Sequence, residues 1–205
     1  GFGSGKTTAL VWKTIVLLHE SEWFGDLTGN IGMIGRLRYT DFEKYTLPEL
    51  FKYLPRQLIR KYYKKDGMLD LINGSTLIFT HFDSTEHLQS SNIGFAAIDQ
   101  MEQVDWDVFR CVGYERTRLK TLNRYDDYGK LIIPEFNRAG ECISVNEEDR
   151  AAELKFQCAF GACNPRRGWI YNKFVKNEKL KDSPIDQIRK KYNPDYKLIM
   201  SSTYE

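Results

Sequence analysis

The chain opens with GFGSGKTT, Gly1–Thr8, and this stretch decides which fold the remaining sequence can form. Its end fits the pattern G-x-x-x-x-G-K-[ST], whose first glycine would lie one position before Gly1. Glycines let the backbone turn sharply and approach a ligand closely, and successive backbone N–H groups can then point at an anion. The stretch predicts a phosphate-binding loop. We expect the chain to be a fragment cut in or near this loop, with an apolar strand upstream of it.

Outward from the loop, the apolar residues of Thr7–His19 cover one broad helical face, so a helix is predicted to follow directly. Further buried strands are predicted at 30–37, 93–99 and 157–165, and further helices at 42–54, 106–119 and from Trp169. Strands that alternate with helices predict an α/β fold with a mainly parallel sheet. Together with the loop, this predicts the three-layer α/β/α sandwich of a P-loop NTPase.

Three segments depart from the alternation. Met68–Ile72 and Ser75–Phe79 are separated only by Asn73-Gly74, which predicts a hairpin with a tight turn. Residues 120–154 are charged and weakly periodic, and we interpret them as a small β insertion with short strands at 131–133 and 142–145. The apolar run Tyr196–Thr203 predicts a last strand near the chain end. We interpret residues 1–205 as one ATPase domain truncated at both ends.

Composition excludes several classes of function. The chain has 205 residues, with 30 Lys and Arg against 28 Asp and Glu, so nucleic-acid binding would depend on a local basic patch. RQLIRKYYKK, Arg56–Lys65, is one such patch, but we favour a solvated helix with Leu58, Ile59 and Tyr62 turned inward. The apolar runs are far shorter than the roughly 20 residues that span a bilayer, so no membrane partner is expected.

The metal-binding residue types form no recognisable motif. The four cysteines, at 111, 142, 158 and 163, include no C-x-x-C pair, and we interpret Cys158 and Cys163 as buried apolar side chains in a reducing compartment. His19, His81 and His87 show no spacing typical of ligands or nucleophiles, and we interpret them as structural.

The loop residues carry the first part of the predicted chemistry. Nucleotide binding is assigned to Gly3, Ser4, Gly5, Lys6, Thr7 and Thr8. Backbone N–H groups of the loop would surround the phosphates, and Lys6 would hold the β- and γ-phosphates as a catalytic group. Thr7 would ligate Mg²⁺ through its hydroxyl. The expected cofactors are therefore ATP and Mg²⁺.

A second part follows the strand IGFAAID. An acid that ends an apolar strand is typical of a Walker B motif, so Asp99 is predicted to contact Mg²⁺. Gln100 occupies the next position, where many P-loop ATPases have a glutamate. If the chain turns helically after Asp99, Glu102 shares its face, and we assign Glu102 as the catalytic base. Three alternatives remain: Gln100 orients the water, Asp105 is the base, or the site does not hydrolyse nucleotide.

A third part is GACNPRRGWIY, in which Asn164 ends a strand before Pro165. The Asn164 amide would face the phosphates and sense the γ-phosphate. An ordinary Asn-Pro turn is an equally good alternative for this pair of residues. An arginine could also stabilise the transition-state charge in the nucleotide site of a neighbouring subunit. The candidates are Arg116, Arg118, Arg166 and Arg167, and the sequence does not single out one of them.

In order and approximate spacing, four stretches resemble the ATPase domain of tailed-phage large terminase subunits. They are GFGSGKTT (1–8), NGSTLIF (73–79), GFAAIDQMEQVDWDVF (94–109) with RTR (116–118), and GACNPRRGWIYNKF (161–174). The resemblance covers most of the chain outside 120–154. It implies the P-loop class with an additional strand and a catalytic glutamate, with the upstream strand beside 157–163. It also implies that Asn164 lies in the family's coupling motif.

The resemblance further implies an ATP-driven motor that moves double-stranded DNA into an empty capsid in the host bacterial cytoplasm. Expected partners are DNA, the capsid portal, the terminase small subunit and further copies in a ring on the portal. A nuclease domain is expected only beyond this chain. Phe2 stands where many members carry an arginine, so that residue's role does not transfer, and the adenine-contacting glutamine motif would lie upstream. Rival functions are another P-loop ATPase or helicase, or a non-hydrolysing nucleotide-binding assembly module.

Overall fold

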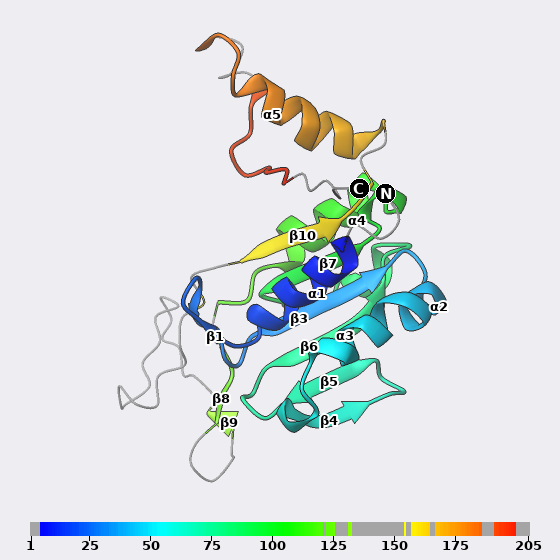
Figure 1. The fold of residues 1–205 in the computed structure, drawn as a ribbon, viewed down its shortest axis with the longest axis vertical. Helices are drawn as coiled ribbons and strands as arrows, with labels where there is room; N and C mark the ends of the chain where they lie inside the picture. Colours follow the sequence, from blue (N-terminus) through cyan, green and yellow to red (C-terminus); the bar gives the residue numbers. More distant parts are fainter. Residues whose placement is uncertain are drawn as a thin grey trace.

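The computed structural model describes residues 5–120, 122–125, 131–132, 154, 157–164, 167–185 and 191–199. Its centre is a six-stranded sheet in the order β10-β7-β3-β6-β5-β4 (Figure 1). The strands are β3 (Ile31–Arg36), β4 (Ile59–Tyr63), β5 (Met68–Leu71), β6 (Thr76–His81), β7 (Phe95–Asp99) and β10 (Cys158–Ala162). The first four in spatial order are mutually parallel, β5 pairs antiparallel with β6, and β4 pairs antiparallel with β5. The predicted α/β class with a mainly parallel sheet is confirmed.

Helices cover both faces of this sheet. On one face lie α1 (Lys6–Val16) and a continuous helical run made of α2 (Tyr39–Asp41), a π-helical segment (Phe42–Thr46) and α3 (Leu47–Tyr53). The other face carries α4 (Trp106–Arg110), which continues as a π-helical segment, Cys111–Arg116. A further helix, Tyr171–Val175 continuing into α5 (Lys176–Leu180), follows β10. The helices predicted after the loop, at 42–54, at 106–119 and from Trp169 are all present.

Alternating strand residues build two cores. On β3, Ile34 packs with α1 in one apolar cluster, while Met33 packs with α4 in the other. Successive side chains of a strand point to opposite faces of the sheet, so a strand buried on both faces must be apolar at nearly every position. Gly32 and Gly35 fit this crowded strand because they have no side chain. A Cβ at Gly32, for example, would lie 2.1 Å from the Phe95 ring. The molecule is a three-layer α/β/α sandwich.

The predicted hairpin is present between β5 and β6, and Gly74 carries its turn. Gly74 has φ +85°, whereas Asn73 keeps a negative φ, so a glycine alone takes the left-handed conformation. The Gly74 N–H donates to the Leu71 carbonyl, and the Leu71 N–H donates to the Ser75 carbonyl. This is a three-residue loop with a glycine bulge rather than a two-residue Asn-Gly turn.

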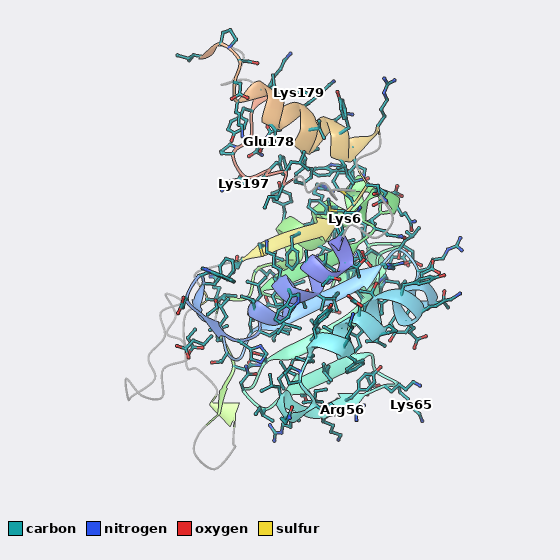
Figure 2. All side chains as sticks on the ribbon, in the orientation of Figure 1. Lys6, Arg56, Lys65, Glu178, Lys179 and Lys197 are labelled. Carbon is teal, nitrogen blue, oxygen red and sulfur yellow. The ribbon has the colours of Figure 1, made fainter. Side chains whose placement is uncertain are left out.

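The helix predicted for Arg56–Lys65 is wrong. After a short 3-10 turn, Arg56–Leu58, the chain forms β4, which pairs with β5 at the edge of the sheet. Pairing with β5 half-buries Ile59 and Tyr62 and leaves the basic side chains exposed. The strand therefore buries the same apolar side chains that a helix would have buried. Figure 2 shows Arg56 and Lys65 at the edge of the sheet far from Lys6.

Two further boundaries differ from the predictions. The helix that begins at Trp106 ends at Arg116, because Thr117 and Leu119 run beside Ile93, with a parallel bridge at Thr117 and a hydrogen bond from the Leu119 N–H to the Ile93 carbonyl. The strand predicted for Tyr196–Thr203 is wrong over 196–199, which form no strand; Ile199 is 93% exposed. A strand needs a partner edge, and Tyr196 instead packs in an aromatic cluster with Trp106.

The β insertion is described in part. β8 (Arg124–Tyr125) pairs antiparallel with β9 (Leu131–Ile132), while residues 142–145 lie outside the described residues. A small hairpin of β1 (Glu20–Ser21) and β2 (Gly25–Asp26) was not predicted. The position of a strand upstream of Gly1 stays a prediction. None of the described helices combines the length and apolarity needed to cross a membrane.

Candidate functional site

The first side of the site is the N-terminus of α1. Gly5 lies at the N-cap with φ +67° and ψ 11°, a left-handed conformation that glycine adopts without a steric penalty. The helix then starts at Lys6, and the Ala9 N–H donates to the Gly5 carbonyl at 2.8 Å. The first N–H groups of a helix have no partner within it and favour negative charge, so this end suits an anion. Gly3 and Ser4 lie outside the described residues.

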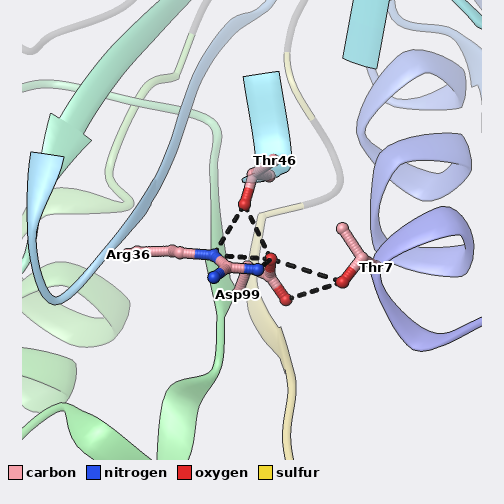
Figure 3. A network of polar contacts seen from close by, with 4 residues as sticks. All are labelled: Thr7, Arg36, Thr46 and Asp99. Carbon is pink, nitrogen blue, oxygen red and sulfur yellow. Dashed lines mark hydrogen bonds and ion pairs between the residues drawn. The ribbon is translucent and has the colours of Figure 1, made fainter. Parts of the chain in front are cut away.

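The second side is the carboxyl end of β7, where the strand delivers Asp99. The Asp99 side chain is buried, and Thr7 Oγ1 lies 3.2 Å from Oδ1 and 3.4 Å from Oδ2 (Figure 3). Thr7 and Asp99 are 92 residues apart in the sequence. Parallel strands end at one edge of a sheet, and the helix that follows the loop begins at that edge. The structure thus brings together the two side chains to which the sequence assigned the metal.

Sequence reasoning missed two residues that also hold Asp99. Arg36, at the end of β3, donates to Asp99 Oδ2 from Nε at 2.9 Å and from Nη2 at 2.5 Å. Thr46, in the π-helical segment, donates to the same oxygen at 2.7 Å and accepts from Arg36 Nε at 2.8 Å. Arg36 ends the apolar run IGMIGR just as Asp99 ends FAAID, and this similarity was a signal that the two residues meet.

The two oxygens of Asp99 have different surroundings. Oδ2 accepts from Arg36 and Thr46, while Oδ1 is the oxygen that lies nearer the Thr7 hydroxyl. A hydroxyl oxygen and a carboxylate oxygen 3.2 Å apart are hard ligands of the kind that Mg²⁺ takes, usually together with water and phosphate oxygens. The residues present therefore fit a magnesium ion at Oδ1 and Thr7, with Oδ2 fixed by the guanidinium.

The third side of the site is marked by Cys163, directly after β10, whose thiol is influenced by the charges of Glu102 and Lys6. Burial raises the pKa of the Cys163 thiol, the Glu102 carboxylate raises it further, and the Lys6 ammonium lowers it. Lys6 and Glu102 therefore act on the same thiol from α1 and from the turn after β7. Among the described residues, Glu102 Oε2 is buried without a hydrogen-bond partner. A buried carboxylate oxygen without a partner is costly, and a bound water or ligand would satisfy it.

The chain does not turn helically directly after Asp99, so the premise on which Glu102 was predicted to share the face of Asp99 is wrong. Gln100 has φ 57° and ψ 49°, the left-handed conformation, and a 3-10 turn, Met101–Gln103, follows it. A left-handed residue that is not glycine is uncommon and stores local strain. Asp105 is exposed at the start of α4, whereas Glu102 is half-buried. Of the acids considered as base, only Glu102 combines burial with an oxygen that lacks a partner among the described residues.

The remaining predicted residues are less closely gathered. Thr8 donates to Glu49 Oε1 at 2.6 Å, so its hydroxyl points toward α3, and Asn164 is exposed just beyond β10. Arg116 donates to the Gln89 carbonyl within this chain. Arg118 and Arg167 are exposed, and Arg166 lies outside the described residues. The assigned roles of these residues stay predictions.

Neither a protein-family profile nor a curated protein matches the sequence. Among solved structures, the large terminase from a thermophilic bacteriophage matches with 11% identity and a TM-score of 0.47, over 97% of this chain and 38% of that one. A mutant of the large terminase ATPase domain from Thermus phage P74-26 matches with 12% identity and a TM-score of 0.49, over 96% and 71%. The first of these large terminases, in complex with ADP, matches with 12% identity and a TM-score of 0.44, over 97% and 38%. The chain thus spans less than half of the first large terminase.

Proposed function

We propose that this chain is an ATP-hydrolysing P-loop domain, and that it serves as the motor domain of a viral terminase large subunit. The observation that carries the proposal is the contact of 3.2 Å between the Thr7 hydroxyl and the Asp99 carboxylate. It joins a glycine-led helix N-terminus to the acid at the end of a buried parallel strand, which is the arrangement of a Walker A and a Walker B motif. The sequence resemblance supports the narrower assignment to terminases.

Each side chain has a defined task in this proposal. Lys6 and the N–H groups at the start of α1 would hold phosphate oxygens, and Thr7 with Asp99 Oδ1 would hold Mg²⁺. When bound, Mg²⁺ neutralises charge on the phosphates. Arg36 and Thr46 keep the Asp99 carboxylate in one orientation. Glu102 would accept the proton of the attacking water, because its buried Oε2 has no partner among the described residues.

The test compares two threonine-to-valine variants in the full-length protein. Thr7→Val removes the hydroxyl beside Asp99, and Thr76→Val removes a hydroxyl that donates to Asp70 at 2.9 Å outside the site. We expect Mg²⁺-dependent phosphate release to fall by at least about tenfold in Thr7→Val and to stay near the parent rate in Thr76→Val. Equal rates of phosphate release in the two variants would contradict the assignment of Thr7 and Asp99 as the Mg²⁺ site.

The motor role has its own test. We infer that the domain acts on double-stranded DNA with the capsid portal, the terminase small subunit and further copies in a ring on the portal, in the bacterial cytoplasm at the procapsid. ATP hydrolysis by the full-length protein should rise when double-stranded DNA and portal-bearing procapsids are both present. A rate that single-stranded DNA raises instead, without procapsids, would favour a helicase.

A non-hydrolysing nucleotide-binding module is a second candidate. It is favoured by Gln100, which follows Asp99 where a glutamate is common and which adopts a left-handed conformation. Such a module would bind ATP with Mg²⁺ and release no phosphate. A phosphate-release assay beside a binding titration separates the two functions.

A further inference from the structure

Two of the three histidines and one aspartate gather at the end of β6, outside the candidate nucleotide site. His81 is the last residue of β6, Asp83 follows two positions later, and His87 lies in the 3-10 turn Glu86–Leu88. One ligand atom from each of the three side chains lies within 4.8 Å of the other two. Their spacing in the sequence, HFDSTEH, predicted no such group.

The distances between the ligand atoms are close to those around a small cation. His81 Nε2 lies 3.4 Å and His87 Nδ1 lies 4.0 Å from Asp83 Oδ1. Ligand atoms about 2.0–2.1 Å from a tetrahedral zinc ion are roughly 3.3–3.4 Å apart, so rotations of exposed side chains would bring all three into range. The side chains are 39%, 54% and 32% exposed for His81, Asp83 and His87, which leaves room for an ion and for water.

The hydrogen bonding of His87 defines which of its ring nitrogens is free to act as a ligand. His87 Nε2 lies 2.7 Å from the His81 carbonyl oxygen, and a carbonyl can only accept, so Nε2 carries the proton. In the neutral ring, Nδ1 then presents its lone pair toward Asp83, with Ser84 Oγ 3.4 Å away. A histidine that donates its other N–H to a backbone carbonyl is the usual arrangement at metal sites, because this bond fixes the tautomer and the ring orientation.

We propose that His81, Asp83 and His87 bind one divalent transition-metal ion of the zinc class. Two imidazoles favour Zn²⁺ over Mg²⁺, which prefers oxygen ligands, and one carboxylate offsets part of the charge of the ion. The stacked rings of His81 and His87, with centroids 4.3 Å apart, place both imidazoles on the same side of the loop. On the solvent-exposed side of the cluster, water molecules would complete the coordination of the ion.

The proposed metal site is separate from the candidate nucleotide site but adjacent to it. β3 and β6 are paired so that Arg36 lies opposite His81, and the Phe82 N–H donates to the Arg36 carbonyl at 2.8 Å. The metal would fasten the end of β6 to the connection that leads to β7. In the same connection the Gln89 carbonyl accepts from Arg116. A bound ion would therefore restrain the connection that leads into β7, the strand that carries Asp99.

A metal-free interpretation makes different predictions. If the cluster is only an ion pair between histidine and Asp83, it has no selectivity for Zn²⁺. Cysteines are a second source of zinc binding, since Cys111, Cys158 and Cys163 are free thiols. The experiment must therefore distinguish imidazole ligands from thiolate ligands.

The test measures metal binding by the full-length protein at neutral pH, after treatment with a chelator. Equilibrium dialysis against Zn²⁺ should give one equivalent that His87→Gln and Asp83→Asn each weaken by at least about tenfold. Co²⁺ used as a probe at this site should give a visible spectrum without a thiolate charge-transfer band. Zn²⁺ should raise the melting temperature of the parent, and equal Mg²⁺ should not.

Glu86→Gln is the matched control, because it removes one exposed carboxylate from the same loop outside the cluster. It should keep the full equivalent of Zn²⁺, and circular dichroism should show that all variants are folded. The proposal is overturned if the parent binds no zinc, if Asp83→Asn and Glu86→Gln bind it equally, or if the cobalt spectrum shows thiolate ligands. ATP hydrolysis enters none of these readouts, so the outcome is independent of the proposed ATPase function.

Discussion

Arg36 and Asp99 form a buried ion pair, with Nη2 2.5 Å from Oδ2 and side chains that are 8% and 2% exposed. They are 63 residues apart in the sequence, and the parallel register of β3 and β7 explains their meeting. Gly35 lies opposite Ile98, so the next residue of each strand, arginine on one and aspartate on the other, emerges at the same edge. The carboxylate thereby ties both strands to Thr7 of α1 and Thr46 of the π-helical segment.

Arg36→Met should destabilise the protein strongly, because it leaves Asp99 buried without its counter-charge. Removing one partner of a buried ion pair costs about 3–5 kcal/mol of unfolding free energy. Arg38→Met is the matched control, since Arg38 is exposed two positions later and its loss should cost within about 0.5 kcal/mol. Urea unfolding measures both values. Equal stability of the two variants would show that the ion pair contributes nothing to the fold.

Glu102→Gln should abolish turnover while nucleotide binding stays within about twofold, because the amide keeps the shape but cannot accept a proton. Loss of a general base lowers kcat by roughly 10²–10⁴-fold. Asp105→Asn, which alters the exposed acid three residues later, should leave kcat unchanged. Single-turnover hydrolysis and a binding titration measure the two effects. If Asp105→Asn is the inactive variant, the base has been assigned to the wrong acid.

Cys163 reports on the charges around it. Burial and Glu102 raise the pKa of its thiol, so at pH 8 less thiolate is present than in an unperturbed cysteine and alkylation is slow. Glu102→Gln should lower this pKa and speed alkylation, and Lys6→Met should raise it and slow alkylation. Cys158 is an internal reference, because burial raises its pKa to about 11 and Glu102 is not among the causes. Peptide mass spectrometry follows both thiols. An unchanged Cys163 rate in both variants would place Glu102 and Lys6 elsewhere.

Gly5→Ala tests whether the left-handed cap of α1 serves ligand binding. A Cβ at Gly5 would meet no atom within 4 Å, so the cost comes from its φ of +67° and should be about 1–2 kcal/mol. Gly25 has φ +73° and equally open surroundings, so Gly25→Ala should cost about the same. We expect only Gly5→Ala to lower nucleotide affinity. Thermal unfolding and a binding titration give the comparison, and an equal effect on affinity in both variants would contradict the assignment.

The contact between Thr7 and Asp99 was predictable because each residue is defined by its local pattern. A glycine loop that enters a helix, and an acid that ends an apolar strand, each fix the end of an element. The parallel sheet then brings these ends together. Arg36 and Thr46 were not predicted, because their roles depend on the register of neighbouring strands and on a π-helical turn. The identity of the base stays a prediction.

The wrong predictions concern segments whose structure depends on a partner. Leu58, Ile59 and Tyr62 fit one face of a helix, but β5 offered an open edge and Ile59–Tyr63 became a strand. Residues 196–199 have strand-forming side chains, yet the Asn177 side chain and neighbouring aromatic rings hold Tyr196 away from the sheet. The group of His81, Asp83 and His87 forms only because the chain turns after β6.

The basic edge formed by β4 has a consequence for the behaviour of concentrated protein. β4 ends the strand order of the sheet, and the exposed side chains of Arg60, Lys61, Lys64 and Lys65 surround it. Two copies approaching through this edge would bring like charges together, and their repulsion opposes the growth of an intermolecular sheet. High salt weakens that repulsion, so high ionic strength is the condition under which aggregation through β4 should begin.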